Sequence, residues 1–168
     1  MTVSVVKGSA IAGRYRVRTE HAHLVDPTGD SRIYQLDISV HGFDQYKPSN
    51  NSRLVMVDDG YDYLTSVEYE LENLLDEGRS FDLCIYNAGM DPFEYCTNGG
   101  KEGISMRTLA RREELVFSWC RSRRIPVAFT IAGGYLGGRL DQCDLIRLHR
   151  MTVQAAAHAF LDTGTYQA

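Results

Sequence analysis

The amino-acid sequence predicts an α/β domain with a mainly parallel sheet. Apolar runs rich in β-forming residues occupy positions 32–39, 82–87 and 127–131. Segments whose apolar residues recur every three or four positions follow these runs, at 61–77, 106–124 and 140–160. Strands that alternate with long helices form βαβ units, and these units build parallel sheets that bind ligands at the carboxyl ends of their strands.

The first thirty residues carry the weakest pattern. Three arginines, Arg14, Arg16 and Arg18, alternate with Tyr15 and Val17. This alternation is compatible with a short amphipathic strand or with a disordered lead-in. We therefore expect a lead-in over residues 1–30 and one domain over residues 31–162.

The first half of that domain begins with the strand at 32–39, which is rich in β-formers. A loop at 42–51 follows, because Gly, Pro, Ser and Asn gather there, and residues 53–57 form a short extended piece. Asp59 or Asp62 can cap the next helix. The buried face of that helix is marked by Leu64, Val67, Leu71, Leu74 and Leu75.

The second half contains the strand at 82–87, which is apolar enough to be buried on both faces. Ser105 is a suitable N-cap for the following helix. That helix must end before Ile125, since Pro126 disfavours helical backbone at the preceding residue. The strand at 127–131 and the final helix complete the domain.

The composition of the chain limits the classes of function that it can have. A chain of 168 residues suits one domain with a sizeable core. Its net charge of −4 and pI near 5.7 argue against general nucleic-acid binding, which needs a basic face. No segment reaches the roughly 20 apolar residues that span a bilayer, so we expect no membrane partner. Four dispersed cysteines without a C-x-x-C pair suggest a cytoplasmic protein with free thiols.

Asp91 is the first candidate for chemistry. It follows the strand at 82–87 through Ala88-Gly89-Met90, and Pro92 holds it extended. Small residues let the backbone approach another group closely, and a carboxylate held this way suits a metal ion or a substrate donor. The alternative is a turn aspartate that hydrogen-bonds its own backbone.

The run Gly133-Gly134-Tyr135-Leu136-Gly137-Gly138 is the second candidate. Such a loop could cradle a phosphate in a small Rossmann-like nucleotide binder, but the G-x-G-x-x-G and P-loop spacings are both missing. The glycines could instead let Tyr135 project into a site, where its hydroxyl would donate to a developing oxyanion. A plain turn with an exposed tyrosine is the remaining interpretation.

The five histidines give weaker signals. His21 and His23 have the proximity of metal ligands, whereas His149 and His158 fall on the final helix and are interpreted as ordinary helix residues. His41 receives no role.

Taken together, Asp82–Asp91, Gly99-Gly100, the helix through Arg111-Arg112-Glu113 and Ile125–Tyr135 resemble the C-terminal half of the zinc-dependent histone deacetylase superfamily, in the branch of acetoin-utilisation and acetylpolyamine deacetylases. The resemblance covers roughly residues 31–159. It implies a three-layer αβα fold of the arginase/deacetylase type, apparently truncated at its N-terminus.

The resemblance also implies roles for individual residues. Asp91 matches the family's second zinc-binding aspartate, in its Ala-Gly-x-Asp turn, and Gly89, Gly133 and Gly134 would support the site. Tyr135 matches the catalytic tyrosine that polarises the amide carbonyl of an acetyl-lysine or acetylpolyamine while zinc-bound water attacks. Asp37 would help to form a monovalent-cation site.

The sequence departs from the family in its remaining zinc ligands and its base. An Asp-x-His motif is expected about twenty residues before the strand at 32–39, where Arg14-Tyr15-Arg16 stands, and arginine cannot ligate zinc. The paired catalytic histidines would precede Met1. Cys96-Thr97 replaces the family's Asp-Pro.

Three hypotheses follow, because stable zinc sites take three or four protein ligands. The chain could be a deacetylase domain that is inactive alone. It could be a non-enzymatic half-domain that complements a separate N-terminal chain or serves as a binding module. Finally, His21 and His23 could be substitute ligands beside Asp91.

Overall fold

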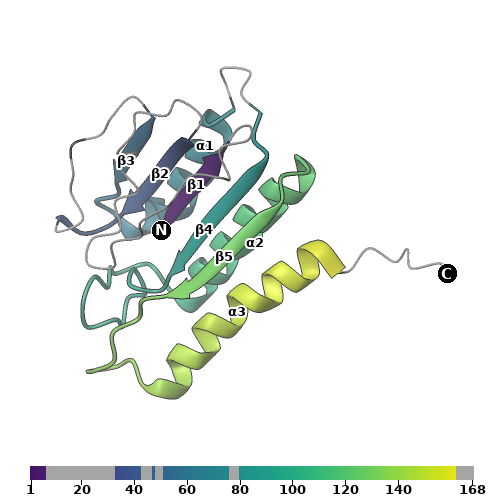
Figure 1. The fold of residues 1–168 in the computed structure, drawn as a ribbon. Coiled ribbons are helices and arrows are strands. Elements are labelled where there is room, and N and C mark those ends of the chain that lie inside the picture. Colours follow the sequence, from purple (N-terminus) through teal and green to yellow (C-terminus); the bar gives the residue numbers. More distant parts are fainter. Residues whose placement is uncertain (7–32, 43–46, 48–50, 76–79, 162–168) are drawn as a thin grey trace.

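The computed structural model describes residues 1–6, 33–42, 47, 51–75 and 80–161. The expected amphipathic strand around Arg14–Arg18 and the pair His21 and His23 lie outside the described residues. The elements are β1 (Thr2–Val6), β2 (Ile33–Ser39), β3 (Ser52–Met56), a short 3-10 turn η3 (Gly60–Asp62), α1 (Tyr63–Asn73), β4 (Leu83–Gly89), α2 (Met106–Ser122), β5 (Val127–Ala132) and α3 (Gln142–Leu161) (Figure 1).

The described strands form one sheet in the order β3-β2-β1-β4-β5. β2 pairs in parallel with β3, and β4 pairs in parallel with β5. β1 lies between these pairs and runs antiparallel to both β2 and β4, so the other four strands share one direction. The parallel pairs are compatible with the predicted α/β class. The central antiparallel strand was not predicted.

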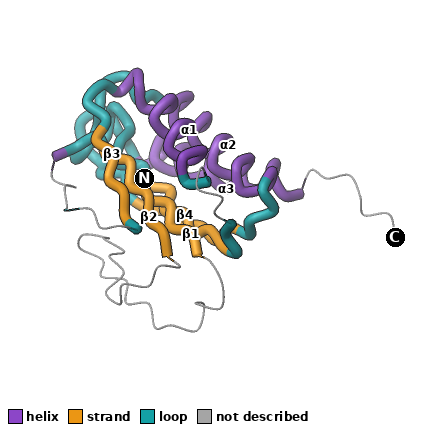
Figure 2. Tube along the Cα trace, turned by 90° about the horizontal axis from the view of Figure 1, so that it is seen from above, coloured by secondary structure: helices purple, strands orange, loops and turns teal. Residues whose placement is uncertain are grey.

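The three helices pack side by side, α1 against α2 and α2 against α3. Figure 2 shows them gathered on one side of the sheet. The three-layer arrangement implied by the resemblance is therefore not confirmed by the described part of the chain. None of the described helices is long and apolar enough to span a bilayer.

The core lies between the sheet and this helical layer. Tyr86 on β4 contacts Phe117 on α2 edge-on, and Phe117 contacts Phe129 on β5 in the same way. Leu36 and Ile38 on β2 are also fully buried. Burial of this apolar surface is the main force that holds the helices on the sheet.

Local signals set the helix boundaries. Ser105 caps α2 as predicted: its hydroxyl accepts the N–H of Thr108, and the Thr108 hydroxyl accepts the N–H of Ser105. Asp59 caps η3 by accepting the N–H of Tyr61. α1 ends at Asn73, four residues before the predicted limit.

Candidate functional site

The carboxyl ends of β4 and β5 bring the two candidate segments together. These strands pair in register as far as Gly89 and Ala132, and Met90 N–H then donates to the carbonyl of Ala132 at 3.0 Å. The turn that carries Asp91 and the turn that begins at Gly133 therefore leave the sheet side by side. This edge is where ligands bind in open α/β sheets.

Asp91 is held by the glycine pair that the sequence singled out. Its Oδ1 accepts the N–H of Gly134 at 2.8 Å. A Cβ at Gly133 would stand 2.5 Å from that oxygen, and a Cβ at Gly134 would stand 2.2 Å from Leu145 on α3. Both glycines also have positive φ, +69° and +88°. Side chains at either position would displace the carboxylate or the helix.

Gly89 plays a different part. A Cβ there would meet nothing within 4 Å, so the absence of a side chain is not what matters. Its carbonyl accepts a hydrogen bond from Nη1 of Arg112 at 2.8 Å. The strand end is thus fastened from the helical layer, two residues before Asp91.

Arg112 belongs to a fully buried network. Its guanidinium pairs with Glu113 Oε1, and its Nη1 also donates to the Tyr63 hydroxyl at 3.3 Å. Tyr86 donates to the same Glu113 oxygen at 3.0 Å. Burial, opposed by the Arg112 charge, raises the pKa of Tyr86 well above its usual range, so this phenol stays protonated and remains a donor.

Tyr135 occupies the exposed side of the same edge. Its side chain is 54% exposed. Its N–H donates to the sulfur of Cys96 at 3.1 Å, and its carbonyl accepts from Thr97 N–H at 3.3 Å. Cys96 and Thr97 therefore hold the tyrosine's backbone.

His149 also reaches this site, which sequence reasoning missed. It lies one helical turn after Leu145 on α3, and its Nδ1 is buried with no hydrogen-bond partner in the described part of the chain. Burial lowers the pKa of His149 below its ordinary value, while the Gly133 backbone and the charges of Asp91 and Glu113 oppose that shift. The signal available in the sequence was its four-residue spacing from Leu145.

Asp37 lies apart from Asp91. It sits on β2, level through Thr2 of β1 with Asn87 of β4, so two strand spacings of roughly 10 Å separate it from that strand. Its carboxylate is buried and accepts the side-chain amide of Gln35. The cation role of Asp37 stays a prediction.

The end of β2 supplies a second residue that sequence reasoning passed over. β2 and β4 run in the same direction, so Ser39-Val40-His41 leaves the sheet at the edge where Asp91 stands. His41 is exposed, and the Ser39 hydroxyl hydrogen-bonds its backbone. The segment has the spacing of Asp-x-His, with serine in place of aspartate. The motif's expected location near Arg14 lies outside the described residues.

The described residues do not fit a complete zinc site. No group of three or more His, Cys, Asp or Glu side chains that could hold a metal occurs within them. Asp91 offers its carboxylate, whose Oδ1 also accepts the Gly134 N–H, and His41 stands at the same edge. A neutral serine hydroxyl is a poor substitute for the third, anionic ligand.

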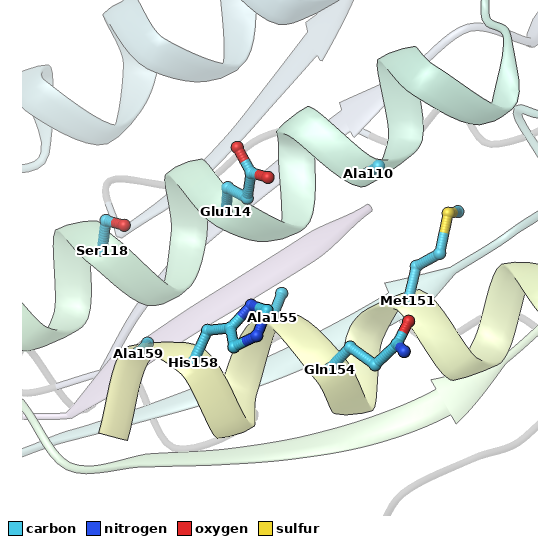
Figure 3. A pocket seen from close by; sticks show the side chains of 8 residues that line it. All are labelled: Ala110, Glu114, Ser118, Met151, Gln154, Ala155, His158 and Ala159. Carbon is cyan, nitrogen blue, oxygen red and sulfur yellow. The ribbon is translucent and has the colours of Figure 1, made fainter. Parts of the chain in front are cut away.

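A groove of about 370 Å³ lies elsewhere, between α2 and α3 (Figure 3). It contains neither Asp91 nor Tyr135. Its walls are Ala110, Glu114, Ser118, Met151, Gln154, Ala155, His158 and Ala159. The groove and the strand-end site are therefore separate features.

Comparison with known proteins gives distant, partial matches. An uncharacterised protein of Picosynechococcus sp. is 36% identical over 103 residues, which cover 61% of this chain and 32% of that protein. Histone deacetylase 2 of Arabidopsis thaliana is 31% identical over 124 residues, covering 69% of this chain and 31% of the plant protein. No model of a known protein family matches the sequence. The chain spans about a third of the length of these curated relatives.

Proposed function

We propose that this chain is a histone deacetylase-like domain, related to zinc-dependent hydrolases of acetyl-lysine or acetylpolyamine amides, whose own metal site is incomplete. The observation that carries the proposal is the pairing of two turns at one sheet edge: Asp91 accepts the Gly134 N–H, and Tyr135 follows directly. The partial similarity to the plant histone deacetylase supports the same class.

In this proposal Asp91 is a metal ligand and Tyr135 is the donor to the amide oxygen. A phenol can stabilise the oxyanion that forms when an amide carbonyl is attacked. Zinc would supply Lewis acidity to such a reaction. Because the described residues offer an aspartate and a histidine but no third ligand, we expect the chain alone to bind zinc weakly and to hydrolyse amides little or not at all.

The test is zinc binding by the purified chain, measured by calorimetry and by metal content after dialysis. We expect weak binding that falls further in Asp91→Asn. Ser39→Asp restores an anionic ligand beside His41 and should tighten binding, and the gain should vanish in Ser39→Asp/His41→Ala. Tight stoichiometric zinc in the unaltered chain, with metal-dependent release of acetate from an acetyl-lysine peptide, would refute the incomplete-site proposal.

A second candidate function is a non-enzymatic half-domain that another chain completes. Exposed apolar residues favour it: Ile146, Val153 and Phe160 follow one another at seven-residue spacing along α3, and each is more than 40% exposed. Ile131 on β5 is 49% exposed, and β5 pairs only with β4 among the described strands. Exposed apolar stripes and open strand edges are surfaces that partners cover.

Light scattering during size-exclusion chromatography tests this candidate. An apolar stripe left uncovered should make the chain self-associate, and Ile146→Glu/Val153→Glu should restore a monomer. Glu substitutions at Gln154 and His158 in the groove provide the control. A monodisperse monomer of the unaltered chain would count against an obligate partner.

A further inference from the structure

Behind the two strand-end turns lies a buried polar layer that no part of the proposed chemistry uses. Arg112 fastens the carbonyl of Gly89 at 2.8 Å, and its partner Glu113 is fully buried. Glu113 Oε1 takes the Arg112 guanidinium and the Tyr86 hydroxyl, but Oε2 is buried without a hydrogen-bond partner among the described residues. A buried carboxylate oxygen without a partner destabilises the folded state, so a neighbouring hydrogen-bond donor would stabilise it.

His149 enters this layer from α3. Leu145, one turn earlier, lies so close to Gly134 that a Cβ there would clash with it, so the beginning of α3 packs against the glycine turn. Residues four apart share one face of a helix, so the imidazole of His149 faces the same turn. The Gly133 backbone acts on the pKa of the ring, which means that the two lie close together, and Nδ1 is buried with no hydrogen-bond partner among the described residues.

These unpartnered atoms have matching chemistry. An imidazole nitrogen can donate, and a carboxylate oxygen can accept. α2 packs against α3, and the charge of Glu113 acts on the ring of His149. The ring therefore lies within electrostatic reach of the buried acid, and one bridging water would satisfy both atoms.

We propose that His149 is a positioning residue of the strand-end site. It fixes the Gly133-Gly134 turn against the helical layer, and through the Gly134 N–H it sets the orientation of the Asp91 carboxylate. Arg112 performs the corresponding task for the end of β4. That these turns form a functional site rests on the proposed function, but the contacts of His149 can be tested without any metal or activity.

The test is nuclear magnetic resonance of the full 168-residue chain, with the Gly134 amide as reporter. This N–H bonds to Asp91, so its chemical shift and hydrogen exchange follow the carboxylate. In His149→Leu we expect the Gly134 amide to exchange about tenfold faster or more, with a shifted resonance. The Val116 amide, in the middle of α2, should keep its exchange rate. His149→Gln retains a donor and should recover much of the effect.

His158→Leu is the matched control, since it removes an imidazole from the same helix on the groove side. It should leave the Gly134 amide unchanged. An unchanged Gly134 amide in His149→Leu, or acceleration spread equally over Gly134 and Val116, overturns the proposal. If His149→Leu does not fold, the test is made on the wild-type chain. A nuclear Overhauser effect between the His149 ring and Gly133 Hα supports the positioning role, and its absence refutes it. Zinc titration of the same samples tests the proposed function independently of the exchange rate of the Gly134 amide.

Discussion

The ends of β4 and β5 emerge side by side but are built in opposite ways. β4 is an interior strand, and its end is fastened by a fully buried arginine. β5 is the last described strand, and Ile131 near its end is about half exposed, as is Tyr135 beyond it. The carboxylate is therefore fixed to the core, whereas the phenol extends from a loop in contact with solvent.

In the proposed function, this difference matches the separate roles of Asp91 and Tyr135. A group that holds a cation or orients a substrate gains from rigidity, because preorganised ligands lose little freedom on binding. A group that meets a substrate at the surface must remain accessible. The comparison also separates the structural supports. A charged network lies under β4, whereas the backbone of Tyr135 is held by the sulfur of Cys96 and the N–H of Thr97.

The largest expected effect comes from removing the support of β4. Arg112→Met leaves Glu113 as an unpaired buried charge and should lower the free energy of unfolding by about 3–5 kcal/mol in denaturant titrations. The exposed pair of Arg147 and Asp144 on α3 gives the control, and Arg147→Met should cost less than about 1 kcal/mol. Arg112→Met/Glu113→Leu should recover much of the loss. Similar losses for Arg112→Met and Arg147→Met would mean that the buried network under β4 stabilises the fold no more than an exposed ion pair does.

A smaller loss should follow changes in the glycine turn. Gly133→Ala brings strain from positive φ, about 1–2 kcal/mol, and a clash with the Asp91 carboxylate. Gly138→Ala has the same kind of φ, +58°, but nothing within 4 Å of the added Cβ. Its loss should therefore be the strain alone. Equal losses in thermal unfolding of the two variants would show that Asp91 moves aside freely.

The pH dependence of stability tests the environment of His149. Its folded-state pKa lies below its unfolded value near 6.5. Its contribution is therefore fully present above that value and is lost as pH falls from about 6.5 towards the folded-state pKa. Denaturant titrations from pH 8 to pH 5 should show a steeper decline for the wild type than for His149→Gln. Parallel curves would place the ring in an environment like water.

The smallest effect concerns the thiols, whose modification reports burial without disturbing the fold. A hydrogen bond with Cys120, together with burial, raises the pKa of Cys84 far above its usual range, so both thiols should be unreactive. Cys143 is exposed and should react first with a disulfide reagent at pH 8. Cys143→Ser should abolish the fast phase. A fast phase that persists would mean that a buried thiol, Cys84, Cys96 or Cys120, becomes accessible readily.

Much of the fold was predictable because its signals are local. The strand expected at 127–131 is observed at Val127–Ala132, and the Ser105 cap was predicted from one residue type before an apolar pattern. β1 also has a local signal, because Thr2, Val3, Val5 and Val6 are β-branched, and the prediction missed it. Its place in the middle of the sheet could not be read locally, because its partners lie on average more than thirty residues away.

The part of the candidate site that lies at the ends of β4 and β5 could be predicted from the sequence, because strand ends can be. Asp91 and Gly133 are neighbours because β4 and β5 are parallel and in register, which strand–helix alternation predicts. The surroundings of His149, Arg112 and Glu113 could not be read in the same way. Whether a helical residue meets solvent, core or a strand-end turn depends on how α2 and α3 pack, and the sequence pattern marks only an apolar face.

The place of β1 has a consequence for how the polypeptide acquires its shape. Residues 2–6 are synthesised before both of their partner strands, and the second of these, β4, begins only at Leu83. β1 can take its place between both neighbours only after β4 has been synthesised. Such long-range pairing slows folding. Until then the edge of β2 that β1 will cover stays open, and early association with a chaperone would protect it from other chains.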